Sequence, residues 1–161
     1  MRTRAGFLGL LVLGPGRPEG HYWLGVDYGV YGQAKGVLSG LSLVGSIKDE
    51  MNKELAIDPS YDDGGPDRAL GRMYYELPGI FGSGKQKSLE QLLKSERMGP
   101  CVGLTRIYLA DTYLALKDVA KARQDLEFVI DTEPGLQPNP EAAREKQMAR
   151  EKLESKEFQV K

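Results

Sequence analysis

The chain is poor in the residues that build metal centres and covalent cross-links. Its 161 residues include a single cysteine, Cys101, and a single histidine, His21. One cysteine excludes an internal disulfide and every multi-cysteine zinc site, and one histidine excludes histidine-rich catalytic metal sites. No run of the sequence approaches the roughly 18 apolar residues that a membrane-spanning helix needs. These shortages rule out several enzyme classes, and they lead us to expect no metal site and no transmembrane segment. We also expect no catalytic residues and no cofactor.

Neither sign of charge is in excess. Lys and Arg together number 22, Asp and Glu number 23, and the net charge is −1. A general nucleic-acid binder carries a basic surplus, so nucleic acid is not an expected partner. The length fits one domain or one short repeat array, and such a chain buries about 70% of the surface that its unfolded form exposes.

Glycine is concentrated at the front of the chain, where 11 of the 20 glycines fall in residues 1–45. Two arginines followed by a short apolar run resemble a secretory signal, so residues 1–19 are expected to be disordered or signal-like. Further on, five glycines recur three or four residues apart, which places them on one side of a helix. We expect another helix of the fold to pack closely over this stripe, which comprises Gly25, Gly29, Gly32, Gly36 and Gly40.

The second half of the chain contains a repeat of 34 residues. Four pairs of positions match at this offset: Pro100 with Pro134, Leu92 with Leu126, Ser88 with Ala122, and Ser95 with Val129. A period of 34 with small, large and aromatic residues in these places is typical of tetratricopeptide helical hairpins. In the last hairpin, Leu109, Ala110 and Tyr113 share one face of the first helix, and Asp118 is placed to cap the second helix.

These patterns predict an all-α fold. We expect a tetratricopeptide-like α-solenoid of about three helical hairpins, in units 20–59, 64–100 and 103–134, followed by a capping helix over 140–157. The repeat domain then spans residues 20–157. In the first unit the second helix is expected at about 45–57, with about eight extra residues between the two helices. In the second unit, the glycine-rich stretch over 77–85 predicts an enlarged loop.

In such arrays the first helices of successive units line a concave face, where partners usually bind. Two arginines one turn apart are costly to bury unpaired, and an arginine can hold a carboxylate with two hydrogen bonds. The sequence thus predicts a non-catalytic binding or scaffold protein that takes a protein partner, or a small hydrophobic or carboxylate-bearing ligand. The predicted groove residues are Tyr28, Tyr31, Arg68, Arg72, Tyr75, Ile107 and Asp111.

The strongest enzyme-like pattern is the stretch 79–86, which matches a phosphate-binding loop up to its last position. There Gln86 stands where a hydroxyl side chain should hold magnesium, and the preceding residues 68–77 read as helix rather than strand. A nucleotide-binding protein that uses the Lys85 loop is therefore only a remote alternative. Asp62 and Asp63 read as solvated charges of a turn, and Cys101 reads as a buried packing residue.

Several short strings occur in an order that resembles one family. They are Asp58-Pro59-Ser60-Tyr61, Gly64-Gly65-Pro66, Arg68-Ala69-Leu70-Gly71, Leu77-Pro78-Gly79 and Leu104-Thr105-Arg106-x-Tyr108-Leu109-Ala110. Together they resemble the T-component family of tripartite ATP-independent periplasmic transporters. The resemblance implies a periplasmic, all-helical, non-enzymatic protein that pairs with a solute-binding component, handles a small ligand and can form homo-oligomers. A general protein-interaction repeat protein, unrelated to transport and located in the cytoplasm, is the alternative.

Overall fold

The computed structural model describes residues 16–78, 84–132 and 140–159, and helices are the only regular secondary structure among them. The predicted all-α class is confirmed. The helices are α2 (Pro18–Lys35), α3 (Val37–Ile57), α4 (Tyr61–Glu76), α5 (Lys85–Met98), α6 (Gly103–Ala115), α7 (Val119–Asp131), α8 (Pro140–Leu153) and α9 (Lys156–Gln159). The signal-like stretch over 1–15 and most of the enlarged loop, residues 79–83, lie outside the described residues.

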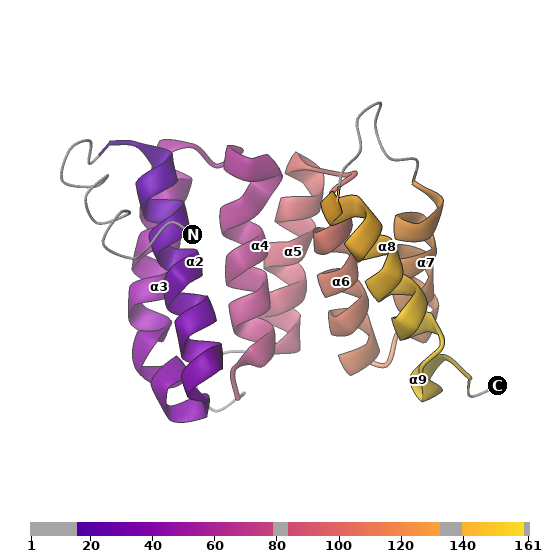
Figure 1. The fold of residues 1–161 in the computed structure, drawn as a ribbon. Helices are drawn as coiled ribbons and strands as arrows, with labels where there is room; N and C mark the ends of the chain where they lie inside the picture. The colour runs from indigo at the N-terminus through magenta and orange to yellow at the C-terminus, as the bar shows by residue number, and fades with distance from the viewer. Residues whose placement is uncertain (1–15, 79–83, 133–139, 160–161) are drawn as a thin grey trace.

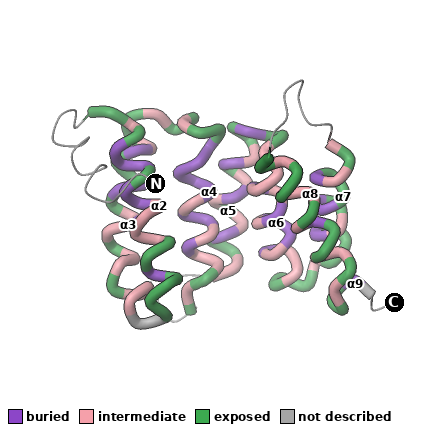
Figure 2. Tube along the Cα trace, in the orientation of Figure 1, coloured by how far each residue is buried: buried purple, intermediate pink, exposed green. Residues whose placement is uncertain are grey.

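Neighbouring helices pack in pairs, α2 on α3, α4 on α5 and α6 on α7, and the pairs stand side by side in one row (Figure 1). This arrangement is compatible with an α-solenoid. Figure 2 shows that buried positions lie along the helix faces that meet one another, while the outer faces are exposed. Among the described helices, none is both long enough and apolar enough to cross a bilayer.

Three of the four pairs that match at the 34-residue offset are buried at both positions, whereas Pro100 is exposed and Pro134 lies outside the described residues. Leu92 and Leu126 are both fully buried, in α5 and α7 respectively. Ser88 and Ser95 are also fully buried, and each hydroxyl pairs with a threonine hydroxyl of α6: Ser88 with Thr112 at 3.0 Å and Ser95 with Thr105 at 3.1 Å. These pairs satisfy buried polar groups that would otherwise destabilise the interface. The 34-residue repeat in the sequence therefore corresponds to positions where neighbouring helices pack together.

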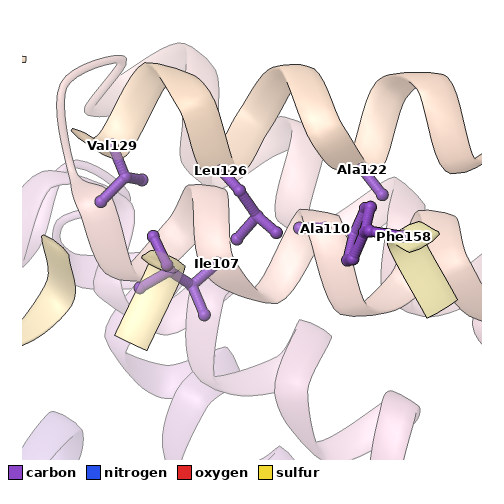
Figure 3. Packing of buried hydrophobic residues seen from close by; sticks show 7 residues of the cluster. Ile107, Ala110, Ala122, Leu126, Val129 and Phe158 are labelled. Carbon is purple, nitrogen blue, oxygen red and sulfur yellow. The ribbon is translucent and has the colours of Figure 1, made fainter. Parts of the chain in front are cut away.

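The α6–α7 hairpin and the C-terminal helices share one hydrophobic core. Figure 3 shows Ile107 and Ala110 of α6 facing Ala122, Leu126 and Val129 of α7, with Phe158 of α9 closing one end. Tyr113 packs against this cluster, as its spacing predicts. The Asp118 carboxylate accepts the Lys121 backbone N–H at 3.2 Å, so the predicted cap of α7 is present. The predicted terminal helix ends earlier than 157, because α8 stops at Leu153 and α9 follows it.

The first hairpin differs from the prediction. Its second helix does not begin near residue 45, because α3 starts at Val37, and only Gly36 separates it from α2. The extra residues lengthen both helices instead of forming a connection. Gly36 has a φ of +88°, a conformation that glycine adopts readily and other residues rarely do. One glycine is therefore enough to reverse the chain here.

The first turn of α4 is also unusual. Asp62, Asp63 and Gly64 have φ values of +50°, +51° and +78°, so the regular helix begins only after them. Gly64 is required for a second reason: a Cβ at this position would lie 2.8 Å from the Ser95 Cα of α5. The left-handed turn brings the Asp62 carboxylate to the side chain of Arg68, one of the predicted groove residues.

Candidate functional site

A groove of about 610 Å³ runs between the first hairpin and the helices α4 and α6. Its walls are mainly apolar, and each of these helices supplies part of them. The apolar wall residues include Val26 and Val30 of α2, Leu41, Val44 and Ile47 of α3, Met73 of α4 with Leu77 just after its end, and Leu104 of α6. Clefts of this size with a few polar groups among apolar walls are the usual form of small-molecule sites.

The glycine stripe of α2 explains why the groove exists. A Cβ on Gly32 would lie 3.0 Å from the Gly40 Cα, and one on Gly25 would collide with Met51, so these two glycines let α3 approach closely. Gly29 lies between them but lines the groove, and among the described residues no atom beyond its own turn of helix and chain neighbours comes within 4 Å of the place where its Cβ would be. The prediction that all five glycines share one helix is wrong, because Gly36 forms the turn and Gly40 lies on α3, where it packs against Gly32. Close packing is present at Gly25 and Gly32, whereas Gly29 leaves space open.

Arg72 is the polar centre of the groove wall. Its Nη1 donates to Asp111 Oδ2 of α6 at 3.0 Å, and its Nη2 pairs with Glu76 one turn further along α4. The guanidinium also stacks on two aromatic rings, with centroids at 5.0 Å for Tyr75 and 4.8 Å for Tyr108. Stacking and ion pairing together hold the planar group in one orientation.

Arg68, one turn before Arg72, is buried, and it both lines the groove and holds two helices together through an ion pair. Its Nη2 pairs with the Asp62 carboxylate, which also accepts the Tyr22 hydroxyl at 2.8 Å. Burial is the largest cause that raises the pKa of Tyr22, so this hydroxyl stays protonated and donates. Asp62 is thus not a merely solvated turn charge. It compensates the positive charge of a buried arginine and ties α2 to α4.

The structure brings four of the seven predicted groove residues together. Arg68 and Arg72 line the groove, while Tyr75 and Asp111 contact Arg72 from outside it. Tyr28 is half-buried and packs against the hydrophobic core that the first hairpin shares with α4. Tyr31 is 44% exposed, and Lys35 Nζ lies 5.8 Å from its ring centroid.

Ile107 has to be reassigned, because it is fully buried in the core of the α6–α7 hairpin. Leu104 and Tyr108 are the residues of α6 that line the groove, and Tyr108 was missed. Its position was readable: Leu104, Tyr108 and Asp111 follow a spacing of four and three residues and so share one helix face. Ile107 lies on a different face of α6, and its side chain packs in the core between α6 and α7.

Lys85, the lysine of the phosphate-loop pattern, is engaged with the protein. Its Nζ donates to the Tyr75 carbonyl and lies 3.5 Å from the centroid of the Tyr75 ring. Burial is the largest cause that lowers the pKa of Lys85. The segment before the loop belongs to α4, which agrees with its predicted helical character, and residues 79–83 of the loop itself lie outside the described part.

A cluster of titratable residues lies in the first hairpin, and none of its members lines the groove. His21 Nδ1 and Glu50 Oε2 are 2.6 Å apart, and both residues are buried. One turn along α3, Glu54 is fully buried, and neither of its carboxylate oxygens has a hydrogen-bond partner among the described residues. Burial, the largest cause, and the charge of Asp58 raise the pKa of Glu54 to about 7.

Two further observations bear on chemistry. Cys101 is exposed in the turn before α6, so the expectation that it is buried is wrong. Within residues 16–78, 84–132 and 140–159, no three His, Cys, Asp or Glu side chains are placed to hold a metal ion together.

Comparison with known proteins identifies no family for this chain: no protein-family model matches it, and no curated protein matches it. The function is therefore inferred from the groove.

Proposed function

We propose that the chain is a non-catalytic binding module of tetratricopeptide-like repeats, and that its groove takes a small molecule with an apolar body and an acidic group. The observation that carries this proposal is the groove of about 610 Å³, in which Arg72 is a fixed cation in a mainly apolar wall. An acidic ligand with an apolar body matches both properties, because burial of the apolar part drives binding and the arginine selects the charge.

The tetratricopeptide-like assignment is supported by the second and third hairpins. Gly71 of α4 and Ala110 of α6 occupy equivalent buried places, where the small residue lets the helix approach its partner. A Cβ on Gly71 would lie 2.6 Å from the Leu92 Cγ, so α4 and α5 are nearly in backbone contact there. Together with the 34-residue offset, these places follow the tetratricopeptide pattern of small residues at the contact between paired helices.

The two carboxylate partners of Arg72 differ in exposure, which indicates how a ligand would bind. The Asp111 side chain is only 13% exposed, whereas the Glu76 side chain is 44% exposed and lines the groove. A ligand carboxylate displaces Glu76 from Arg72 Nη2 at little cost, because an exposed ion pair contributes at most about 1 kcal/mol. Asp111 keeps the guanidinium in place while this exchange occurs.

The resemblance to transporter T-components adds a biological setting to this proposal. In that setting the protein lies in the periplasm and passes the ligand to or from a solute-binding partner. The alternative is a protein-interaction repeat that binds an apolar segment of another protein in the same groove. One observation favours this alternative: α2 exposes Trp23, Val30 and Tyr31 by 38%, 60% and 44%. Exposed apolar side chains of this kind are common at protein interfaces.

Binding of two probes with equal chains but different head groups tests the proposal. We expect decanoate to bind more tightly than 1-decanol, as followed by chemical shifts of backbone amides at concentrations where both probes are monomeric. Shifts should concentrate on α2, α3 and α4. Arg72→Glu should weaken decanoate binding by about tenfold or more, because a charge-assisted hydrogen bond is lost and a repulsive charge is added.

A matched pair of glycine substitutions locates the site. Gly29→Leu fills the groove, whereas Gly45→Leu adds the same side chain to an exposed position of α3 that is not part of the groove wall. We expect Gly29→Leu to abolish binding of both probes and Gly45→Leu to leave it unchanged. Equal binding to both variants would refute the assignment of the groove. If neither probe binds the unaltered protein and a protein partner is instead lost in Gly29→Leu, the protein-interaction alternative is correct.

A further inference from the structure

A chain of ion pairs connects the groove to the C-terminal helix α8. Asp111 of α6 accepts from two cations at once: Oδ2 accepts Arg72 Nη1 of α4 at 3.0 Å, and Oδ1 accepts Lys152 Nζ of α8. The three residues come from three different helices and are separated by 39 and 41 positions in the sequence. Neither Asp111 nor Lys152 is among the residues that line the groove.

α8 is attached to the same wall at a second point. The Glu145 carboxylate accepts the backbone N–H of Leu104, in the first turn of α6, and Leu104 lines the groove. The Glu145 carboxylate also lies directly against Gly103, where a Cβ would collide with it. Burial raises the pKa of Glu145, which fits a carboxylate enclosed between the two helices. α8 thus contacts α6 both beside the groove wall and at the carboxylate that holds Arg72.

The charges of these ion-paired residues determine how strongly Arg72 attracts an anion. Asp111 is shared between Arg72 and Lys152, so Lys152 offsets part of the Asp111 charge through Oδ1. Without Lys152, the full charge of Asp111 acts together with Glu76 on Arg72 and on Lys85, which interacts electrostatically with all three. The positive charge that α8 supplies therefore favours an acidic ligand by weakening the hold of Asp111 on Arg72, even though Lys152 does not touch the ligand.

We propose that Lys152 of α8 is a positioning residue for the groove, and that docking of α8 and binding of an acidic ligand are coupled through Asp111 to Arg72. This inference rests on the proposed function, because it concerns the acidic group of the ligand. Such coupling is reciprocal: if docked α8 strengthens ligand binding, the bound ligand must stabilise the docked α8 by the same factor.

Substitution of Lys152 tests the coupling. We expect Lys152→Gln to weaken decanoate binding about threefold and to leave 1-decanol binding unchanged, the size expected for a partly exposed ion pair. Lys152→Arg should restore decanoate affinity, since it keeps the charge. Lys146→Gln removes the same charge elsewhere on α8 and serves as the control, with affinity expected to stay as in the unaltered protein. Loss of binding of both probes in Lys152→Gln would indicate only a structural role and would overturn the proposal.

A double-mutant cycle separates the path through Asp111 from a general charge effect. In an Asp111→Asn background, Lys152→Gln should change decanoate affinity far less than it does alone, because the residue that links Lys152 to Arg72 is missing. An equal change in both backgrounds would contradict the proposal. Hydrogen exchange supplies the reciprocal measurement: decanoate, but not 1-decanol, should slow exchange of the α8 amides.

The outcomes distinguish the two levels of inference. If the unaltered protein binds neither probe, the proposed function is wrong, and the coupling is wrong with it. If it binds decanoate and Lys152→Gln binds it equally well, the proposed function stands and the role of α8 is rejected.

Discussion

The first hairpin, α2–α3, and the third hairpin, α6–α7, share one helical plan but fill the space between their helices differently. In the third hairpin, Ile107, Leu126 and Val129 are at most 4% exposed and form a continuous core. In the first, glycines bring the backbones of α2 and α3 together, and Val30 remains 60% exposed at the groove. The comparison teaches that close backbone contact at a few glycines can hold a hairpin together while leaving volume open beside it.

The two hairpins also differ in how they bury an acid. Asp125 of α7 accepts Arg106 Nη1 at 2.9 Å, and burial still raises the pKa of Asp125 to about 6. Glu54 of α3 has no such partner in the described structure, and its pKa rises to about 7. A cation thus compensates Asp125 in the third hairpin, as Lys53 does for the buried Glu50 in the first. Glu54 differs from both, because it retains a proton near neutral pH.

The largest expected effect is the loss of core packing in the third hairpin. Leu126→Ala should lower the free energy of unfolding by about 2–5 kcal/mol, because the side chain is fully buried and its removal leaves a cavity. The same substitution at Leu41, on the half-buried groove wall of α3, should cost roughly 1 kcal/mol, since that side chain keeps contact with solvent. Urea unfolding followed by circular dichroism measures both. Equal losses would break the contrast between the hairpins.

The buried Glu54 should make the stability of the first hairpin depend on pH. Its folded pKa lies above its ordinary value of 4.5, so the folded state binds more protons than the unfolded state between pH 4.5 and about 7. The free energy of unfolding should therefore fall as pH rises through this window, by about 1–3 kcal/mol, and change little from this group above it. Glu54→Gln should match the unaltered protein at pH 4.5 and exceed it by that amount at pH 8.

Urea unfolding at a series of pH values measures this effect. Glu90→Gln makes the same substitution at an exposed position of α5, and we expect it to shift stability by no more than about 0.5 kcal/mol at any pH. The interpretation of Glu54 fails if the stability of Glu54→Gln declines in parallel with that of the unaltered protein.

The smallest expected effects distinguish glycines that are needed from glycines that are not. Gly71→Ala should destabilise the protein by about 1–3 kcal/mol, because its Cβ would lie 2.6 Å from the Leu92 Cγ and 3.3 Å from the Leu92 backbone nitrogen. Gly45→Ala, whose Cβ meets no atom within 4 Å among the described residues outside its own turn of helix and chain neighbours, should stabilise the protein by about 0.5–1 kcal/mol through helix propensity. The midpoint of thermal unfolding should fall in Gly71→Ala and rise in Gly45→Ala. A shift in the same direction would contradict the view that only Gly71 is needed for packing.

Much of the fold was predictable because local patterns repeat. Leu92 and Leu126 lie 34 residues apart and are equally buried, and Asp118 caps α7 as its position before the helix predicts. The site was predictable in part. Arg72 and Asp111 were identified as facing inward from helix periodicity, and periodicity also places Tyr108 beside them, although it was missed.

The rest was not predictable from local pattern. The start of α3 at Val37 depends on one glycine with a positive φ, and composition does not distinguish this one-residue turn from the connection of about eight extra residues that was expected. The pairing of Asp62 with Arg68 depends on a left-handed turn at two aspartates. The link from Lys152 to Asp111 joins residues 41 positions apart, and a charged helix read alone does not show which charges find partners.

The sequence alone determined that this protein is helical and repetitive, because apolar periodicity, small residues and capping groups act within one or two turns of the chain. Only the tertiary structure decided where the groove opens and which carboxylate holds which arginine. The physical reason is the distance along the chain over which the deciding interactions act. Helix formation depends on neighbours a few residues away, whereas an open volume and a shared ion pair depend on the distances between whole helices, which are set by every contact in the array together.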